Sequence, residues 1–106
     1  MKTYLLDVVS TSGILQPERL EEYCKAVEAA LPPHAYEGVV AIGGRLPVWA
    51  YSAFLHRVAH PAVAGGTFEP RMDSIIITMG HQADAPTVGS ILPAPKPEEW
   101  IKVTLP

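Results

Sequence analysis

The stretch that decides the fold is residues 39–81, VVAIGGRLPVWAYSAFLHRVAHPAVAGGTFEPRMDSIIITMGH. An apolar strand over 39–42 leads into a glycine turn, and the helix that follows begins at Pro47 and stops at a histidine-proline pair. Strands over 64–68 and 74–79 then form a hairpin with a charged turn. Because polar groups gather at the ends of these elements, we expect the functional site within this stretch.

The segments on either side predict one more helix and two more strands. Residues 2–9 alternate between apolar and polar side chains and predict a strand. Residues 17–31 carry apolar side chains at helical spacing, with a proline at the start and a proline pair after the end. Residues 83–98 are rich in proline and predict an extended arm. Residues 99–105 alternate again, so they predict a strand that pairs with its own sheet or across a dimer.

The order of elements is therefore β-α-β-α-β-β-(proline-rich arm)-β, in a single domain over 1–106. This order predicts a two-layer α/β fold, loosely ferredoxin-like. The strand over 39–42 is apolar on both faces, which places it in the centre of the sheet. The helix after it is apolar most of the way round, so a second subunit is expected to cover its outer face. We therefore expect a homodimer.

Composition narrows the function classes. The 106 residues carry a net charge of −3, whereas general nucleic-acid binding needs a basic surface. A small phosphorylated ligand stays compatible with this charge. No apolar run approaches the ~20 residues of a membrane span, and the first residues do not resemble a signal peptide. With Cys24 as the one cysteine, no intrachain disulfide can form, and we expect a cytoplasmic protein.

The turn Gly43-Gly44-Arg45 is a candidate anion site. A strand followed by glycines and a helix N-terminus presents free backbone N–H groups, and an arginine adds a forked donor. The pattern matches neither a phosphate-binding P-loop nor a dinucleotide turn. A tight turn that only connects a strand to a helix is the simpler alternative.

Two further groups carry titratable side chains. His56 and His60 lie four residues apart, which is metal-ligand spacing, but a pair alone makes half a site and either can be a core residue. Glu69 and Arg71 lie on one side of the hairpin turn, where such pairs are more often solvated.

No side chain stands out as a nucleophile. An enzyme here would use water, a metal or the hydroxyl of its substrate.

The residues from Gly38 to His81 resemble a family of small type III CRISPR accessory proteins, the ring nucleases. In that family a Gly-Arg-x-Pro-[Ile/Val]-Trp-x-Tyr turn and helix lead through a histidine to an Asp-Pro-Arg turn and a strand ending in Ser-His. The matching positions here are Gly44, Arg45, Pro47, Trp49, His60, Pro70, Arg71 and His81. Three positions depart from the family: Glu69 stands for its aspartate, Asp73 for a glycine and Gly80 for the serine.

The resemblance implies a dimer with a ferredoxin-like fold that degrades cyclic tetra-adenylate in a manganese-dependent reaction, which switches off type III CRISPR signalling. Two dimers can close over one ring as a tetramer. In RNA, a 2′-OH can attack its neighbouring phosphate, so no protein nucleophile is needed. The resemblance implies catalytic roles for His60, Glu69 and Arg71, with His60 and Glu69 as metal ligands. It implies substrate binding by Gly43, Gly44, Arg45, Trp49 and His81.

Two other hypotheses use the same residues differently. A non-catalytic relative would bind and sequester the ring, because Glu69 extends about one C–C bond further than aspartate, and misplacement of that order can cost ~10²-fold in rate. A purely structural or regulatory subunit would not bind the ring at all. The three hypotheses predict different results with the ring. A nuclease gives linear products, a sequestering protein retains the intact ring, and a structural subunit does not bind it.

Overall fold

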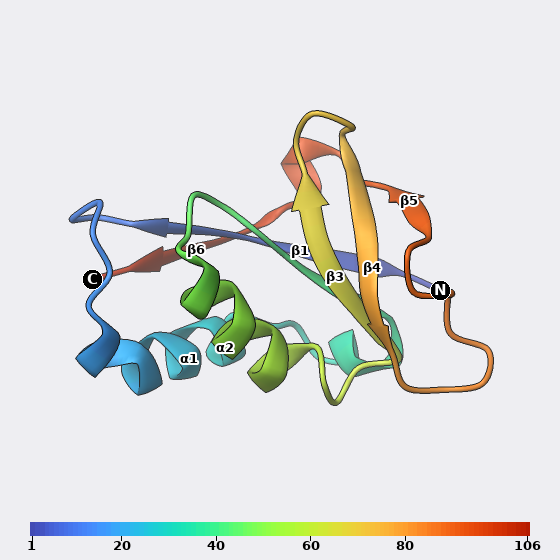
Figure 1. The fold of residues 1–106 in the computed structure, drawn as a ribbon, viewed down its shortest axis with the longest axis horizontal. Coiled ribbons are helices and arrows are strands. Elements are labelled where there is room, and N and C mark those ends of the chain that lie inside the picture. Colours follow the sequence, from blue (N-terminus) through green and yellow to red (C-terminus); the bar gives the residue numbers. More distant parts are fainter.

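A mixed sheet forms the centre of the molecule (Figure 1). The computed structural model describes all residues, 1–106. Across its six strands the order is β5-β4-β3-β2-β1-β6. β6, β1, β2 and β3 run parallel to one another. β4 pairs antiparallel with β3, and β5 pairs antiparallel with β4. The strands are, in chain order, β1 (Thr3–Ser10), β2 (Val39–Gly43), β3 (Ala64–Glu69), β4 (Ser74–Gly80), β5 (Ile91–Pro93) and β6 (Ile101–Leu105).

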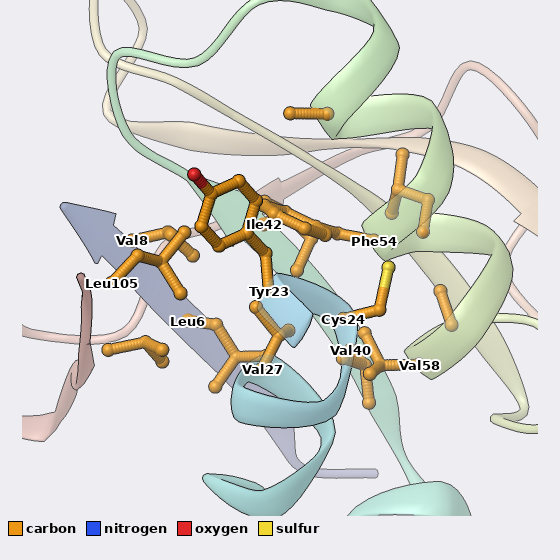
Figure 2. Close-up of a cluster of buried hydrophobic side chains, with 14 of the residues drawn as sticks. Leu6, Val8, Tyr23, Cys24, Val27, Val40, Ile42, Phe54, Val58 and Leu105 are labelled. Carbon is orange, nitrogen blue, oxygen red and sulfur yellow. The ribbon is translucent and has the colours of Figure 1, made fainter. Parts of the chain in front are cut away.

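Two helices, α1 (Leu20–Ala29) and α2 (Val48–Val58), cover one face of the sheet (Figure 1). Tyr23 of α1 and Phe54 of α2 pack against strand side chains such as Ile42 in a cluster of 16 buried residues (Figure 2). Both helices present apolar side chains to this cluster at intervals of three and four residues, as the sequence pattern predicts. Short 3-10 turns over Pro17–Arg19, Ala35–Glu37 and Pro97–Glu99 complete the regular structure.

The proline-rich arm covers part of the other face of the sheet. There a second cluster of six buried residues meets Leu92 and Ala94 of the arm, and Trp100 just after it. The indole Nε1–H of Trp100 donates to the carbonyl of Pro95 at 2.8 Å, and its ring meets Phe68 edge-on with centroids 5.2 Å apart. The arm therefore covers part of this face of the sheet and fixes the position of the Trp100 side chain.

The predicted two-layer α/β fold is confirmed, in a single compact domain. β2 is central and fully buried, as its apolar pattern predicts. β6 pairs with β1 of its own sheet, which decides between the two alternatives left open for it. β5 was not expected, because its three residues lie in a proline-rich segment without periodicity and are recruited by pairing with β4. No helix has the length and apolar character needed to cross a membrane.

The outer surface of α2 is only partly covered within the chain. α1 packs alongside α2, and Arg57 of α2 forms ion pairs with Glu21 and Glu28 of α1. In contrast, Trp49 at the start of the helix is 37% exposed, and the histidine side chains of its last turns are exposed as well. The outer face of α2, which is expected to meet a second subunit, is therefore partly open to solvent in the single chain.

We expect Phe54→Ala to destabilise the fold more than any surface change. Phe54 is fully buried between α2 and the sheet, and truncating a buried phenylalanine to alanine typically costs about 3–5 kcal/mol in the free energy of unfolding. For a chain of this size, the midpoint of thermal unfolding should fall by more than ~10 °C. Ser52→Ala, an exposed position on the same helix, is the control and should leave the midpoint nearly unchanged. Equal midpoints for the two variants would contradict this placement of the core.

Candidate functional site

A cleft of about 310 Å³ opens where β2 and β3 end, beside the middle of β1. The carboxyl ends of parallel strands are the usual place for ligands in α/β sheets. Asp7 of β1 pairs in register with Gly43 of β2, so its carboxylate lies beside the glycine turn. The residues that line the cleft are Leu5, Asp7, Gly43, Gly44, Arg45, Tyr51, Phe68, Pro70 and Trp100.

The glycine turn is tightly constrained at Gly44. Its φ is +126°, and a Cβ placed there would lie 2.2 Å from the carbonyl oxygen of Val8. The Tyr51 hydroxyl donates a hydrogen bond to the Gly44 carbonyl. Burial, and then the negative charge of Asp7, raise the pKa of this phenol, so it remains a protonated donor. The turn is therefore held in one conformation by β1 and α2.

Arg45 follows this turn with its guanidinium exposed and without an ion pair or side-chain hydrogen bond in the chain. It also borders a second hollow, of about 470 Å³, which extends along the end of β1 and shares Asp7 and Gly44 with the cleft. A free guanidinium between two hollows, next to a glycine turn, suits a ligand that carries a phosphate between two larger groups.

The hairpin turn after β3 holds Glu69 and Arg71 as a pair. The two guanidinium contacts to the carboxylate are 3.0 Å and 3.3 Å, and the Arg71 backbone N–H donates to it at 3.1 Å. These hydrogen bonds, from the Arg71 side chain first and its backbone second, lower the pKa of Glu69 below its ordinary value. The carboxylate is therefore ionised at neutral pH, with both oxygens already engaged. Pro70, between the two residues, lines the cleft.

Three histidines gather at the opposite end of β3. The His60 ring lies 5.5 Å from the His56 ring and 4.9 Å from the His81 ring, measured between centroids. The Nδ1 atom of His81 is 3.2 Å from the carbonyl oxygen of Ala62, which fixes the orientation of this ring. All three side chains are exposed, so neither His56 nor His60 is a core residue.

Within one chain, the predicted catalytic residues do not come together. His60 precedes β3, whereas Glu69 ends it and Arg71 follows; the five steps from Ala64 to Glu69, at about 3.3 Å each, separate the two ends by about 17 Å. Gly43, Gly44 and Arg45 share the end that carries Glu69 and Arg71.

The remaining predicted site residues divide between the two ends as well. His81 lies with His60, and Trp49 lies in the first turn of α2 without lining the cleft. No three histidine, cysteine, aspartate or glutamate side chains of the chain gather so that they could hold a metal ion. The residues of one chain therefore do not fit the expected manganese site, and its proposed ligands His60 and Glu69 are separated.

Five residues that line the cleft were not predicted from the sequence: Leu5, Asp7, Tyr51, Phe68 and Trp100. Asp7 interrupts an apolar strand, and this is the one signal that could have drawn attention to it. The sequence pattern places the other residues in predicted strands or in the predicted helix, without a further functional signal. Cys24 is buried in the core away from the cleft, and burial raises the pKa of its thiol.

The fold and the cleft define a small α/β protein with a cleft at the carboxyl ends of parallel strands, whose glycine turn and unpaired Arg45 could hold an anion. A comparison with known families adds the assignment: the family model Cas_csx3, a CRISPR-associated protein, matches residues 8–93. The chain belongs to this CRISPR-associated family. No curated protein matches the chain. The expected membership of a CRISPR-associated family is confirmed, whereas ring cleavage and manganese dependence stay predictions.

Arg71→Ala should raise the pKa of Glu69 toward its ordinary value. The variant removes the side-chain hydrogen bonds, which are the largest cause of the lowered pKa, while the backbone donor at this position remains. The ion pair contributes to folding stability above the unfolded pKa of the carboxyl group, and this contribution is lost as the pH falls through the folded pKa. Titration followed by NMR of the side-chain carboxyl carbons measures the shift. Arg45→Ala, at an unpaired arginine, is the control, and an unchanged Glu69 pKa in Arg71→Ala would show that the pair does not persist in solution.

Proposed function

We propose that this protein is a ring nuclease that linearises cyclic tetra-adenylate and so switches off type III CRISPR signalling. The observation that carries the proposal is the convergence of the glycine turn and the unpaired Arg45 at a cleft at one end of the sheet. The hairpin turn that carries Arg71 borders the same cleft through Pro70. Membership of a CRISPR-associated family supports a ligand from that defence system. A small ring engages few phosphates, so a net charge of −3 does not oppose its binding.

The proposed reaction is an internal transesterification of RNA. A ribose 2′-oxygen attacks the adjacent phosphorus and the bond from phosphorus to the 5′-oxygen breaks. The departing 5′-oxygen takes a proton from water, so the linear product carries a 2′,3′-cyclic phosphate at one end and a 5′-hydroxyl at the other. The imidazole of His60 accepts the 2′-hydroxyl proton as the general base. The Arg71 guanidinium stabilises the charge that develops on the phosphate oxygens. Gly43, Gly44 and Arg45 bind a phosphate, with Trp49 and His81 as further ring contacts.

This chemistry requires more than one copy of the chain. His60 and Arg71 lie at opposite ends of β3, so one phosphate can meet both only when the histidine end of one copy faces the hairpin end of another. Such an arrangement is consistent with the expected homodimer and with two dimers that enclose a ring. In it, the Glu69 carboxylate holds Arg71 within its own chain and orients His60 of the facing copy.

The same geometry limits where manganese could bind. A single chain offers no group of three ligands, so a requirement for the metal would belong to the assembled copies. Manganese accepts carboxylate and imidazole ligands, which are the side chains of Glu69 and His60. Activity that persists in full after treatment with a chelator would show that the reaction needs no metal.

The test is incubation of the purified protein with cyclic tetra-adenylate, with and without Mn²⁺, and separation of the products by chromatography. Linear products ending in a cyclic phosphate are expected. Recovery of the intact ring, bound to the protein, would instead support the alternative function, which is sequestration. The engagement of both Glu69 oxygens by Arg71 favours that alternative, because each oxygen then has less capacity left for His60 or a metal ion. Absence of any binding would leave a structural role.

We expect the free protein to be a dimer at micromolar concentration. The motivation is the outer face of α2, where Val48 is 84% exposed and Trp49 is 37% exposed. Light scattering coupled to size exclusion measures the mass directly. Addition of the ring should shift the dimer toward a tetramer, and a monomer with and without the ring would contradict the prediction.

A further inference from the structure

The walls of the cleft carry side chains that neither phosphate binding nor proton transfer uses. Phe68 and Trp100 are half-buried aromatic residues at one side, and Asp7 contributes its one carboxylate. We propose that the cleft is an adenine pocket, in which a base of the ring stacks against Trp100 and donates its 6-amino group to Asp7. This inference rests on the proposed function, since it assigns the base subsite of the same ligand.

The shape and lining of the cleft suit a planar ring. Its volume of about 310 Å³ lies at the lower end of the ~300–1,000 Å³ typical of small-molecule sites. The Trp100 ring is held by its hydrogen bond to Pro95 and by its edge-on contact with Phe68. An aromatic platform fixed in this way stacks on a base at little entropic cost.

Asp7 supplies the means to choose among bases. Its carboxylate is 23% exposed and accepts no hydrogen bond from the chain; the nearest cation, Lys102, is 3.9 Å away. A half-buried carboxylate that accepts no hydrogen bond gains free energy when a ligand donates one to it. The 6-amino group of adenine is a donor, whereas the 6-oxo group of hypoxanthine is an acceptor and would be repelled.

The position of the cleft agrees with the placement of the phosphate. Gly44 and Arg45 border both the cleft and the neighbouring hollow, so a phosphate at this turn places its own base within reach of Asp7. Asp7 and Trp100 both lie outside residues 8–93, the part of the chain that the family model matches. The pocket is therefore completed by the two end segments of this chain.

The test compares the affinities of the protein for cyclic tetra-adenylate and cyclic tetra-inosinate, measured by calorimetry in a chelator. Chromatography of the rings afterwards checks that both stayed intact. The adenine ring should bind about ten- to a hundred-fold more tightly. Asp7→Asn, whose amide offers both a donor and an acceptor, should reduce this preference to within about three-fold. Glu99→Gln, at an exposed carboxylate next to Trp100 that does not line the cleft, is the control and should keep the preference.

Trp100 tests the stacking separately. Trp100→Ala should weaken both rings alike, by about ten-fold, whereas Trp100→Phe should lose only a few-fold because it retains an aromatic face. If Trp100→Ala does not fold, the Asp7 comparison decides. Full preference for the adenine ring in Asp7→Asn overturns the adenine pocket and leaves the proposed function intact. Failure of the unaltered protein to bind the adenine ring at all overturns both.

Discussion

An equimolar mixture of His60→Ala and Glu69→Ala proteins is expected to cleave cyclic tetra-adenylate, although each protein alone should have lost most of its turnover. Each variant keeps the group that the other lacks, and the two groups lie at opposite ends of β3. A site formed between copies can then combine an intact histidine end with an intact hairpin end. With random assembly and equal amounts, about a quarter of the contacts would carry both groups.

The measurement is the initial rate of ring cleavage for each protein alone and for the mixture at the same total concentration. The control is a mixture of Glu69→Ala with the double variant His60→Ala/Glu69→Ala, which restores no carboxylate and should stay inactive. A mixture no faster than the mean of its components would show that His60 and Glu69 do not act in one composite site. Appreciable activity in either single variant would remove that residue from the catalytic set.

Glu69→Ala should lower the rate by about 10²-fold or more while changing ring affinity only a few-fold. In the proposed reaction the carboxylate orients reacting groups, and a loss of positioning at this level can cost ~10²-fold. The proposed phosphate contacts come from the glycine turn and Arg45, so binding should survive. Glu69→Asp restores the side chain that the family carries at this position and should keep or raise the rate. Single-turnover kinetics with separate binding measurements resolve the two effects.

Asp73→Asn is the matched control for Glu69. Asp73 lies in the same turn with a φ of 48°, a left-handed conformation that asparagine also tolerates, and it does not line the cleft. Its rate should match that of the unaltered protein. If Glu69→Ala instead unfolds most of the protein and leaves a folded fraction with full activity, then the carboxylate serves only as the structural partner of Arg71.

Much of the fold was predictable because its signals are local. The apolar run of β2 indicates a central strand, the spacing in α2 indicates a helix, and the glycines at 43 and 44 indicate a tight turn. Each of these depends on side-chain periodicity or backbone freedom within a few residues. For the same reason the glycine turn before α2 and the Glu69–Arg71 pair were found in the sequence.

Only the tertiary structure decided which of these residues lie near one another. The order of the strands places Asp7 beside Gly43, and the return of the arm across the sheet brings Trp100 to the same cleft. It also separates His60 from Glu69, which stand only nine positions apart in the chain. A strand between two residues sets them at opposite ends of a sheet, and pairing between distant segments leaves no local pattern to read. The sequence by itself therefore determined the elements and the chemistry of each turn, while long-range pairing determined the site.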